Sequence, residues 1–187
     1  MKKIVALLLS LCLVLGAASA MAAGEKIALI TMDSIDQHWI TLNEGAQKAA
    51  EELGVTVTFM SPNTKDDAQQ IECVNNAVAG GYQAIIVAAN GPDAISSALN
   101  EAVAAGVKIV YVDSPANFDG AVQTLATNNK NAGVLAGEQM LAALEAKGIT
   151  EGTIGIVNVN AATDSTAQRE AGFREALDGS GFEILET

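Results

Sequence analysis

The sequence predicts an α/β fold built around a parallel β-sheet, on the strength of three observations. Short apolar runs rich in Val and Ile alternate, from residue 26 onward, with longer segments of helical periodicity. Glycines stand where those helical segments should end, and Asp residues stand where several should begin. Because a crossover helix between two strands makes them parallel, this order predicts a sheet with helices on both faces.

The first half of the chain contains four such repeats. We expect strands at 26–31, 55–61, 83–89 and 107–114, separated by helices at 40–54, 65–81 and 91–106. The helix ends are marked by Gly54, Gly80, Gly81 and Gly106, and the helix starts by Asp66, Asp67 and Asp93. These elements predict a doubly wound α/β lobe that spans residues 25–126.

The second half begins another unit of the same kind and then stops. We expect a short strand at 121–126, a helix from about Asn131, a strand at 152–160, a helix at 164–181 and a strand from 182. Residues 127–187 would form this second lobe, whose sheet has too few strands to cover its apolar face. We expect an incomplete version of a longer protein; the alternative is a partner that supplies the rest.

The N-terminus has the pattern of a secretory signal peptide at residues 1–22. Two lysines precede an apolar run, which small residues follow, and cleavage after Ala20 or Ala22 would satisfy the small-residue requirement. An uncleaved anchor is the alternative, but the apolar run is short for a membrane span. Cys12 lies inside that run without small residues before it, which argues against a lipoprotein. We therefore expect a periplasmic or secreted protein.

Composition narrows the class of partner. The chain has 10 basic and 22 acidic residues, a net charge of −12, so phosphate-rich nucleic acid and anionic membranes should repel it. After removal of the leader only Cys73 remains of the cysteines, so no intramolecular disulfide is possible and no zinc site is expected. The apolar helical position of Cys73 predicts a buried structural thiol.

Ligands of open parallel sheets bind beyond the carboxyl ends of the strands, and polar residues gather there in this sequence. The set consists of Asp33, Asp36, Gln37, His38, Asn63, Asn90, Asp113, Ser114, Asn128, Asn129, Asn158, Asn160 and Arg169. The glycine and serine motifs of nucleotide-binding proteins and serine hydrolases are missing, and we expect no enzyme activity, cofactor or metal. Amides, carboxylates, an Arg and a flat ring suit a neutral polyol.

Four segments together resemble the periplasmic substrate-binding proteins of sugar ABC importers, in their type I, ribose-binding-like branch. They are "IALITMDSIDQHWITLNEGAQKAAEELG", "DDAQQIECVNNAVAGGYQAIIVAANGPDAISSALNEAVAAGVKIVYVDS", "ATNNKNAGVLAG" and "TAQREAGFREAL". The resemblance implies a type I periplasmic binding protein fold, in which two Rossmann-like lobes joined by hinge strands close on a sugar. It further implies a monomer that delivers its ligand to an ABC permease.

The same resemblance implies which residues bind the ligand. Its first-loop contacts correspond to Asp36, His38 and Trp39, its acceptor after the fourth strand to Asp113, and its second-lobe Arg to Arg169. The position of Ser114 often holds Arg in the family, so ribose itself is less expected here. Asn129 lies at the expected hinge. The predicted ligand-binding residues are thus Asp36, His38, Trp39, Asp113, Ser114, Asn129 and Arg169.

Other interpretations of these residues remain open from the sequence. Trp39 could pack on the sheet, Asp36 could form an Asx-turn, and Asn90 and Asp93 could cap a helix. At the level of function, a periplasmic sensor for a chemoreceptor or sensor kinase would use the same site. An NAD-type enzyme or a sugar-responsive repressor fits less well, because the glycine fingerprint is missing and a leader stands where a DNA-binding segment would be needed.

Overall fold

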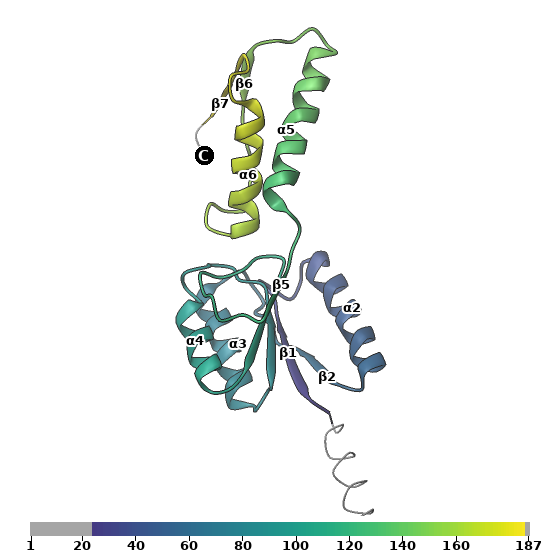
Figure 1. Cartoon of the computed structure of the whole chain (residues 1–187), viewed down its shortest axis with the longest axis vertical. Coiled ribbons are helices and arrows are strands. Elements are labelled where there is room, and N and C mark those ends of the chain that lie inside the picture. The colour runs from purple at the N-terminus through teal and green to yellow at the C-terminus, as the bar shows by residue number, and fades with distance from the viewer. Residues whose placement is uncertain (1–23, 186–187) are drawn as a thin grey trace, which may run out of the picture.

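A computed structural model describes residues 24–185 of the chain. Two α/β units lie one above the other and are joined by a single connection (Figure 1). We call residues 24–125 the first unit and residues 129–185 the second unit. The predicted signal peptide, residues 1–22, lies outside the described residues. In the part of the chain that is described, no helix is both long and apolar enough to span a membrane.

The first unit contains the parallel sheet that the sequence predicts. Its strands are β1 (Lys26–Ile30), β2 (Thr56–Phe59), β3 (Ala84–Val87), β4 (Lys108–Val112) and β5 (Gln123–Leu125), in the order β2-β1-β3-β4-β5. Every neighbouring pair is parallel. The sheet order reverses direction after β1, so the loops after β1 and β3 meet at one edge, which is where open sheets bind ligands.

Three helices cover the two faces of this sheet: α2 (Gln37–Leu53), α3 (Asp67–Ala79) and α4 (Ser96–Ala104). Helix α2 lies on one side, and α3 and α4 lie together on the other (Figure 1). The core between the sheet and α3 and α4 is made of fully buried aliphatic side chains, among them Ile85, Leu99 and Ile109. Because both faces are covered, the central strands β1, β3 and β4 are largely continuous apolar runs rather than alternating ones.

Helix α2 begins three residues earlier than predicted. The carboxylate of Asp36 accepts a hydrogen bond from the backbone N–H of His38 at 3.0 Å, so Asp36 is the N-cap. His38 and Trp39 therefore lie in the first helical turn, and the expectation that they occupy a loop is wrong. The end of the helix is as predicted, because Gly54 takes the left-handed conformation with φ of 69°.

The predicted caps of the third helix are also corrected. Helix α4 begins only at Ser96, after a turn, and no side chain caps it. Asp93 instead accepts a hydrogen bond from the side chain of Asn117 at 2.6 Å, and the Asn90 amide donates to Asp67 at 2.5 Å. Asn90 and Asp93 therefore tie the loop before α4 to the start of α3 and to the loop after β4, and neither side chain caps a helix. These contacts join residues far apart in the chain, so no local pattern in the sequence predicts them.

Cys73 and the N-terminal cap of α3 largely follow expectation. The Cys73 side chain is half-buried and packs against the core rather than being fully buried. Burial, followed by the nearby Glu72 charge, raises the pKa of the thiol, so the reactive thiolate is scarce at neutral pH. Helix α3 is capped by Asp66, as predicted, with its carboxylate 2.8 Å from the Gln69 nitrogen.

The second unit consists of α5 (Asn129–Glu145), β6 (Gly152–Ile154), α6 (Asp164–Leu177) and β7 (Phe182–Ile184). Strands β6 and β7 form a separate parallel sheet of two strands. Strand β6 is shorter than the predicted strand at 152–160, since residues 155–160 pair with no strand in the part of the chain that the structure describes. Helix α5 begins at Asn129 rather than near Asn131, because Asn128 caps it.

Glycines let α5 and α6 pack closely. A side chain added at Gly133 would collide with the backbone carbonyl of Arg169, and one added at Gly172 would collide with the carbonyl of Lys130. Gly137 faces the side chain of Ala176 in the same way. The two backbones therefore approach more closely than larger residues allow, and this contact holds the start of α6 against the start of α5.

Candidate ligand-binding site

A hollow of about 280 Å³ lies where the carboxyl edge of the first sheet meets the start of α6. Five of the seven predicted ligand-binding residues line it, namely Asp36, His38, Trp39, Asp113 and Arg169. Lys65, from the loop after β2, joins them. The residues come from three loops and the start of α2 in the first unit and from α6 in the second. We call this hollow the cleft.

The loop after β1 is organised by two carboxylates. Asp33 is buried, and its Oδ1 accepts hydrogen bonds from the backbone N–H groups of Ile35 at 2.9 Å and Asp36 at 2.7 Å. Asp36 then caps α2 with Oδ1 and leaves Oδ2 3.8 Å from the Lys65 ammonium. Asp33 thus forms an Asx-type turn that fixes the loop, and Asp36 combines capping with a position in the cleft wall.

His38 and Trp39 are neighbours with different environments. The His38 side chain is 58% exposed, and its Nε2 lies 3.4 Å from Oδ2 of Asp113 across the cleft. Trp39 is only 4% exposed, packs with Met32 and Ala88, and touches the His38 ring edge-on at a centroid distance of 4.5 Å. The ring of Trp39 is therefore part of the core as well as of the cleft wall.

The indole nitrogen of Trp39 is an unused hydrogen-bond donor. Its Nε1 is buried and has no hydrogen-bond partner among the described residues. Buried donors in folded proteins are nearly always paired, because desolvation of an unpaired one is costly. An unpaired donor beside a cleft is consistent with a site that a polar ligand would complete.

Asp113 has the most unusual backbone in the described chain. Its φ is 62°, and it is the one non-glycine residue between 24 and 185 with a positive φ. The N–H of Ser114 donates to the carbonyl of Val112 at 2.7 Å, which closes a tight three-residue turn around Asp113. Such strained backbones cluster at functional sites. The turn aims the Asp113 carboxylate, one-quarter exposed, across the cleft toward His38.

Ser114 and Asn129 lie outside the cleft wall. Ser114 is completely buried, and its Oγ is 2.8 Å from both Asp113 Oδ1 and Ser165 Oγ, so it lies behind Asp113. Asn129 is buried at the start of α5, and its Oδ1 has no partner among the described residues. The structure thus brings five of the predicted residues together and places these two beyond direct reach of the hollow.

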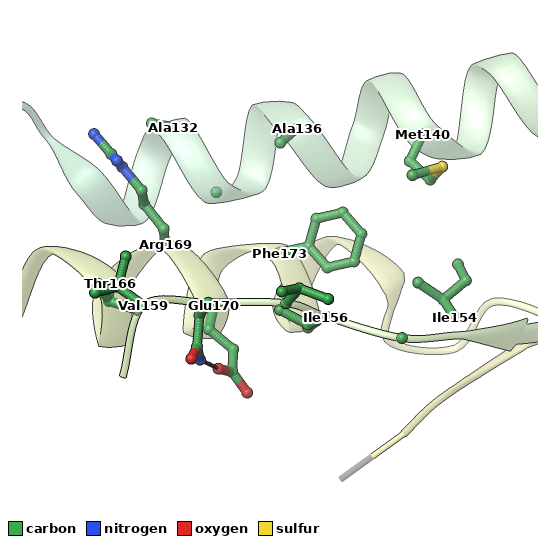
Figure 2. Close-up of a pocket in the computed structure, with 14 residues that line it drawn as sticks. Ala132, Ala136, Met140, Ile154, Ile156, Val159, Thr166, Arg169, Glu170 and Phe173 are labelled. Atoms are coloured by element: carbon green, nitrogen blue, oxygen red, sulfur yellow. Dashed lines mark hydrogen bonds between the residues drawn. The ribbon is translucent and has the colours of Figure 1, made fainter. Parts of the chain in front are cut away.

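Arg169 is the second unit's contribution to the cleft. Figure 2 shows its side chain leaving α6 toward the start of α5, on the side opposite to Glu170. In the described part of the chain it forms no ion pair or side-chain hydrogen bond, whereas Arg174 on the same helix pairs with Glu170 at 2.9 Å. An unpaired guanidinium at the cleft offers up to five donors to a ligand.

Lys65 was missed by sequence reasoning. Its ammonium lies 3.8 Å from both Asp33 Oδ2 and Asp36 Oδ2, so it balances the charge of the first loop while its donors face the cleft. The residue sits in "SPNTKDD", between a predicted strand and a predicted helix. Its place at the carboxyl edge was a usable signal, but only the fold shows that this loop bends toward Asp36.

Gln70 is a second missed residue, with a supporting role. It is 1% exposed, and its amide donates to the carbonyls of Thr31 at 3.0 Å and Ala88 at 2.9 Å. Its Oε1 accepts from the N–H of Asn90 at 3.0 Å. One side chain from α3 thus ties together the ends of β1 and β3, and so it fixes the loops that form the cleft.

Most of the other amides in the predicted polar set make local hydrogen bonds. Asn128 caps α5, Asn160 accepts from the N–H groups of Ala162 and Thr163, and Asn158 donates to Glu170 at 2.8 Å. These bonds occupy the groups that a ligand would need. The position of an amide at the carboxyl edge is therefore weaker evidence of ligand contact than the sequence suggests.

A second and larger hollow, of about 790 Å³, lies within the second unit. It runs between α5, α6 and the segment after β6, and its wall is mostly apolar, including Ala136, Met140, Ile156 and Phe173 (Figure 2). Val157 on this segment is 99% exposed. With its few polar groups at one end, this groove lacks the convergent donors and acceptors of the cleft.

The chemistry of the cleft is that of mixed donors and acceptors on two facing walls. Lys65 and Arg169 can only donate, the carboxylates of Asp36 and Asp113 can only accept, and Trp39 adds an aromatic surface. Within residues 24–185, no group of three or more His, Cys, Asp or Glu side chains is placed to hold a metal ion. Such a set of groups suits a small molecule with several hydroxyl groups.

Comparison with known proteins gives the family. Residues 27–187 match the periplasmic binding protein domain family over nearly the whole described chain. The chain belongs to this family. Its fold is accordingly that of the type I periplasmic binding proteins, as the sequence predicts.

Individual relatives of this periplasmic binding protein are sugar-binding proteins. A ribose import binding protein of Haemophilus influenzae is 26% identical over 185 residues, which cover 99% of this chain and 62% of the relative. A D-apiose import binding protein of Paraburkholderia graminis is 32% identical over 127 residues, covering 67% of this chain and 40% of the relative. The chain thus spans about three-fifths or less of the length of these relatives.

Solved structures agree with the sequence relatives. A carbohydrate transporter solute-binding protein of Agrobacterium radiobacter, in complex with D-arabinose, has a TM-score of 0.83 at 29% identity and covers 87% of this chain and 56% of its own. A solute-binding protein of Agrobacterium vitis with bound D-fucose has a TM-score of 0.80 at 30% identity, with 86% and 56% covered.

Proposed function

We propose that this protein is the substrate-binding component of a sugar ABC importer. It binds a monosaccharide or a sugar-like polyol between its two units and delivers it to a membrane permease. It acts without catalysis, as a monomer, outside the cytoplasm after export by its signal peptide. The relatives named as ribose and D-apiose import binding proteins support this function, and so do the structural relatives solved with D-arabinose and D-fucose.

The observation that carries the proposal is the cleft itself. Acceptors at Asp36 and Asp113 face donors at Lys65 and Arg169, and the aromatic Trp39 lies beside them. A sugar ring presents hydroxyl groups around its rim and a C–H face that packs on an aromatic surface. A sugar carries no net charge, which matches a cleft wall in which two cationic side chains balance two carboxylates.

Binding and closure are expected to be coupled. Asp36, His38 and Asp113 belong to the first unit and Arg169 to the second, so one ligand contacts both units only when they are close together. A ligand that makes additional contacts in the closed state shifts the equilibrium toward that state. The closed form is then the one that the permease recognises.

Isothermal titration of the full chain against D-ribose, D-arabinose, D-fucose, D-tagatose and D-apiose tests the proposal. We expect at least one of these sugars to bind with 1:1 stoichiometry and to change the fluorescence of Trp39, the single Trp of the chain. Saturable binding of none of the five would contradict the proposal.

Arginine variants supply a matched control for the site. Arg169→Ala should weaken binding of the best sugar by roughly tenfold or more, because a charged donor to the ligand is worth about 1.5–3 kcal/mol. Arg174→Ala removes the other arginine of α6, which pairs with Glu170 away from the cleft, and should leave affinity nearly unchanged. Equal affinities of the two variants would remove Arg169 from the site.

A further inference from the structure

Two hydrogen bonds fasten the start of α6 to the first unit. The Oγ atoms of Ser114 and Ser165 are 2.8 Å apart, and Thr163 Oγ1 donates to the carbonyl of Asn90 at 2.9 Å. Ser114, Thr163 and Ser165 are all buried. The two contacts join residues 51 and 73 positions apart in the chain, so they exist only while the units are docked.

The serine contact differs from the threonine contact because it continues to a cleft residue. Ser114 Oγ is also 2.8 Å from Oδ1 of Asp113. Ser114 Oγ has donor geometry toward both Asp113 Oδ1 and Ser165 Oγ but carries only one proton, so the carboxylate, as the stronger acceptor, takes that proton and Ser165 keeps the Ser114 hydroxyl in place from its other side. The result is a chain of hydrogen bonds from α6 through Ser114 to Asp113.

We propose that Ser165 is a positioning residue, which acts through Ser114 to orient the Asp113 carboxylate for ligand recognition when the two units dock. Thr163 Oγ1 donates to the backbone carbonyl of Asn90 and accepts from the side-chain amide of Asn160 at 2.9 Å, so it bonds to no carboxylate of the cleft. The proposal rests on the proposed function, because it assigns Asp113 as a ligand acceptor. It makes the selectivity of a first-unit residue depend on a second-unit side chain, which lines the cleft as Thr163 does.

The geometry explains how this dependence arises. With Oδ1 of Asp113 held by Ser114, the carboxylate plane is fixed and Oδ2 is directed to the side of the cleft where His38 lies at 3.4 Å. When α6 moves away, Ser114 loses its buried partner and its hydroxyl is free to rotate. Asp113 then becomes a less directional acceptor, and a fixed acceptor discriminates hydroxyl positions better than a mobile one.

The experiment compares Ser165→Ala with Thr163→Val, which removes the other docking hydroxyl. Thr163 makes no side-chain cap to α6, so the Val substitution removes only the side-chain hydrogen bonds to Asn90 and Asn160. Two measurements are made on the full chain. The first is the distance between spin labels at Glu51→Cys and Lys147→Cys, in a Cys12→Ser, Cys73→Ser background, without sugar; both label sites are exposed.

The second measurement is the affinity for the tightest-binding sugar of the five named above and for each of its monodeoxy analogues. We expect both variants to increase the population with widely separated labels. Only Ser165→Ala should also reduce the discrimination between the sugar and its deoxy analogues. For the analogue that lacks the hydroxyl bound by Asp113, the ratio of its Kd to that of the sugar should fall by about threefold to tenfold, which corresponds to roughly one hydrogen bond.

A double-mutant cycle identifies the relay. Ser114→Ala and Ser165→Ala should have similar effects on discrimination, and the double variant should have no larger effect than either, because each breaks the same chain. Additive effects would overturn the proposal, as would equal discrimination by Ser165→Ala and Thr163→Val. A Ser165→Thr variant, which keeps the hydroxyl, should restore most of the discrimination.

Failure of the proposed function gives a different result. If no sugar binds, the label distances still report whether Ser165 and Thr163 hold the units together, but the discrimination test has no signal and the positioning role falls with the function. If a sugar binds and the Ser165→Ala variant discriminates like the wild type, the function stands and the positioning role alone is wrong.

Discussion

Asp113 is the residue at which backbone and side chain are most clearly arranged for a purpose other than stability. A left-handed backbone costs an ordinary residue about 1–2 kcal/mol, and Asp tolerates it only somewhat better than most. The tight turn that imposes this conformation also directs the carboxylate across the cleft. The position of this carboxylate after a buried strand was readable from the sequence; its strained turn was not, because it depends on Leu125 accepting the Asp113 N–H at 2.9 Å.

Two substitutions separate strain from recognition at this position. Asp113→Gly should be more stable than Asp113→Ala by about 1 kcal/mol, because only glycine adopts a positive φ without penalty. Both variants should lose sugar binding, since neither has an acceptor. Urea denaturation measures the first effect and calorimetric titration the second. Equal stabilities would show that the turn relaxes when the carboxylate is removed, and retained binding would exclude Asp113 as a contact.

At the scale of elements, the glycine contact between α5 and α6 determines where Arg169 is placed. Residues of α6 reach the cleft only because the helix starts lie against each other, and Gly133 and Gly172 make that approach possible. The sequence predicted both helices, with the start of α6 correct, the start of α5 two residues late and the end of α6 four residues late. It did not predict their close contact, because glycines inside helical patterns are as often tolerated defects as packing sites.

Gly133→Ala and Gly45→Ala form a matched pair of helix glycines. The new methyl group at Gly133 would overlap the Arg169 carbonyl, so we expect a loss of about 1–3 kcal/mol in the free energy of unfolding. At Gly45 in α2 there is open space, so the same change should raise stability by about 0.5–1 kcal/mol through helix propensity. Thermal and urea unfolding measure both, and a stabilised Gly133→Ala variant would contradict the packing.

At the scale of the whole molecule, the two units differ in the size of their sheets. Within residues 24–185, the first has five strands with helices on both faces, whereas the second has two strands and an apolar groove of about 790 Å³. Cooperative stability should therefore come mainly from the first unit. Tyr111 reports on it, since its side chain is 3% exposed and its hydroxyl donates to the carbonyl of Phe118 at 3.0 Å.

Alkaline unfolding should depend on this tyrosine. Burial and, to a smaller extent, the Asp119 charge raise the pKa of Tyr111 to about 12, partly offset by the backbone of Ala116. Because the unfolded chain loses this proton near pH 10, its contribution to stability is complete below pH 10 and is lost as pH rises toward 12. We expect a loss of about 2–3 kcal/mol over that interval.

Tyr111→Phe is the control for this pH dependence. It removes the titrating group, so its stability should fall less steeply above pH 10 than that of the wild type, although it is lower at neutral pH through loss of the hydrogen bond to Phe118. Urea denaturation at a series of pH values measures both curves. Parallel curves above pH 10 would mean that Tyr111 is accessible to hydroxide in the folded state.

The sequence by itself determined the class of fold and predicted five of the residues that line the cleft. Alternating strand and helix patterns, with Gly54 and Asp66 at their ends, fix the order of elements because these signals are local to each segment. Tertiary structure alone decided the strained turn at Asp113, the approach of Lys65 and the contacts of Ser114 with Ser165. Each of these depends on residues distant in the chain, whose contacts exist only after the loops at the carboxyl edge are brought together.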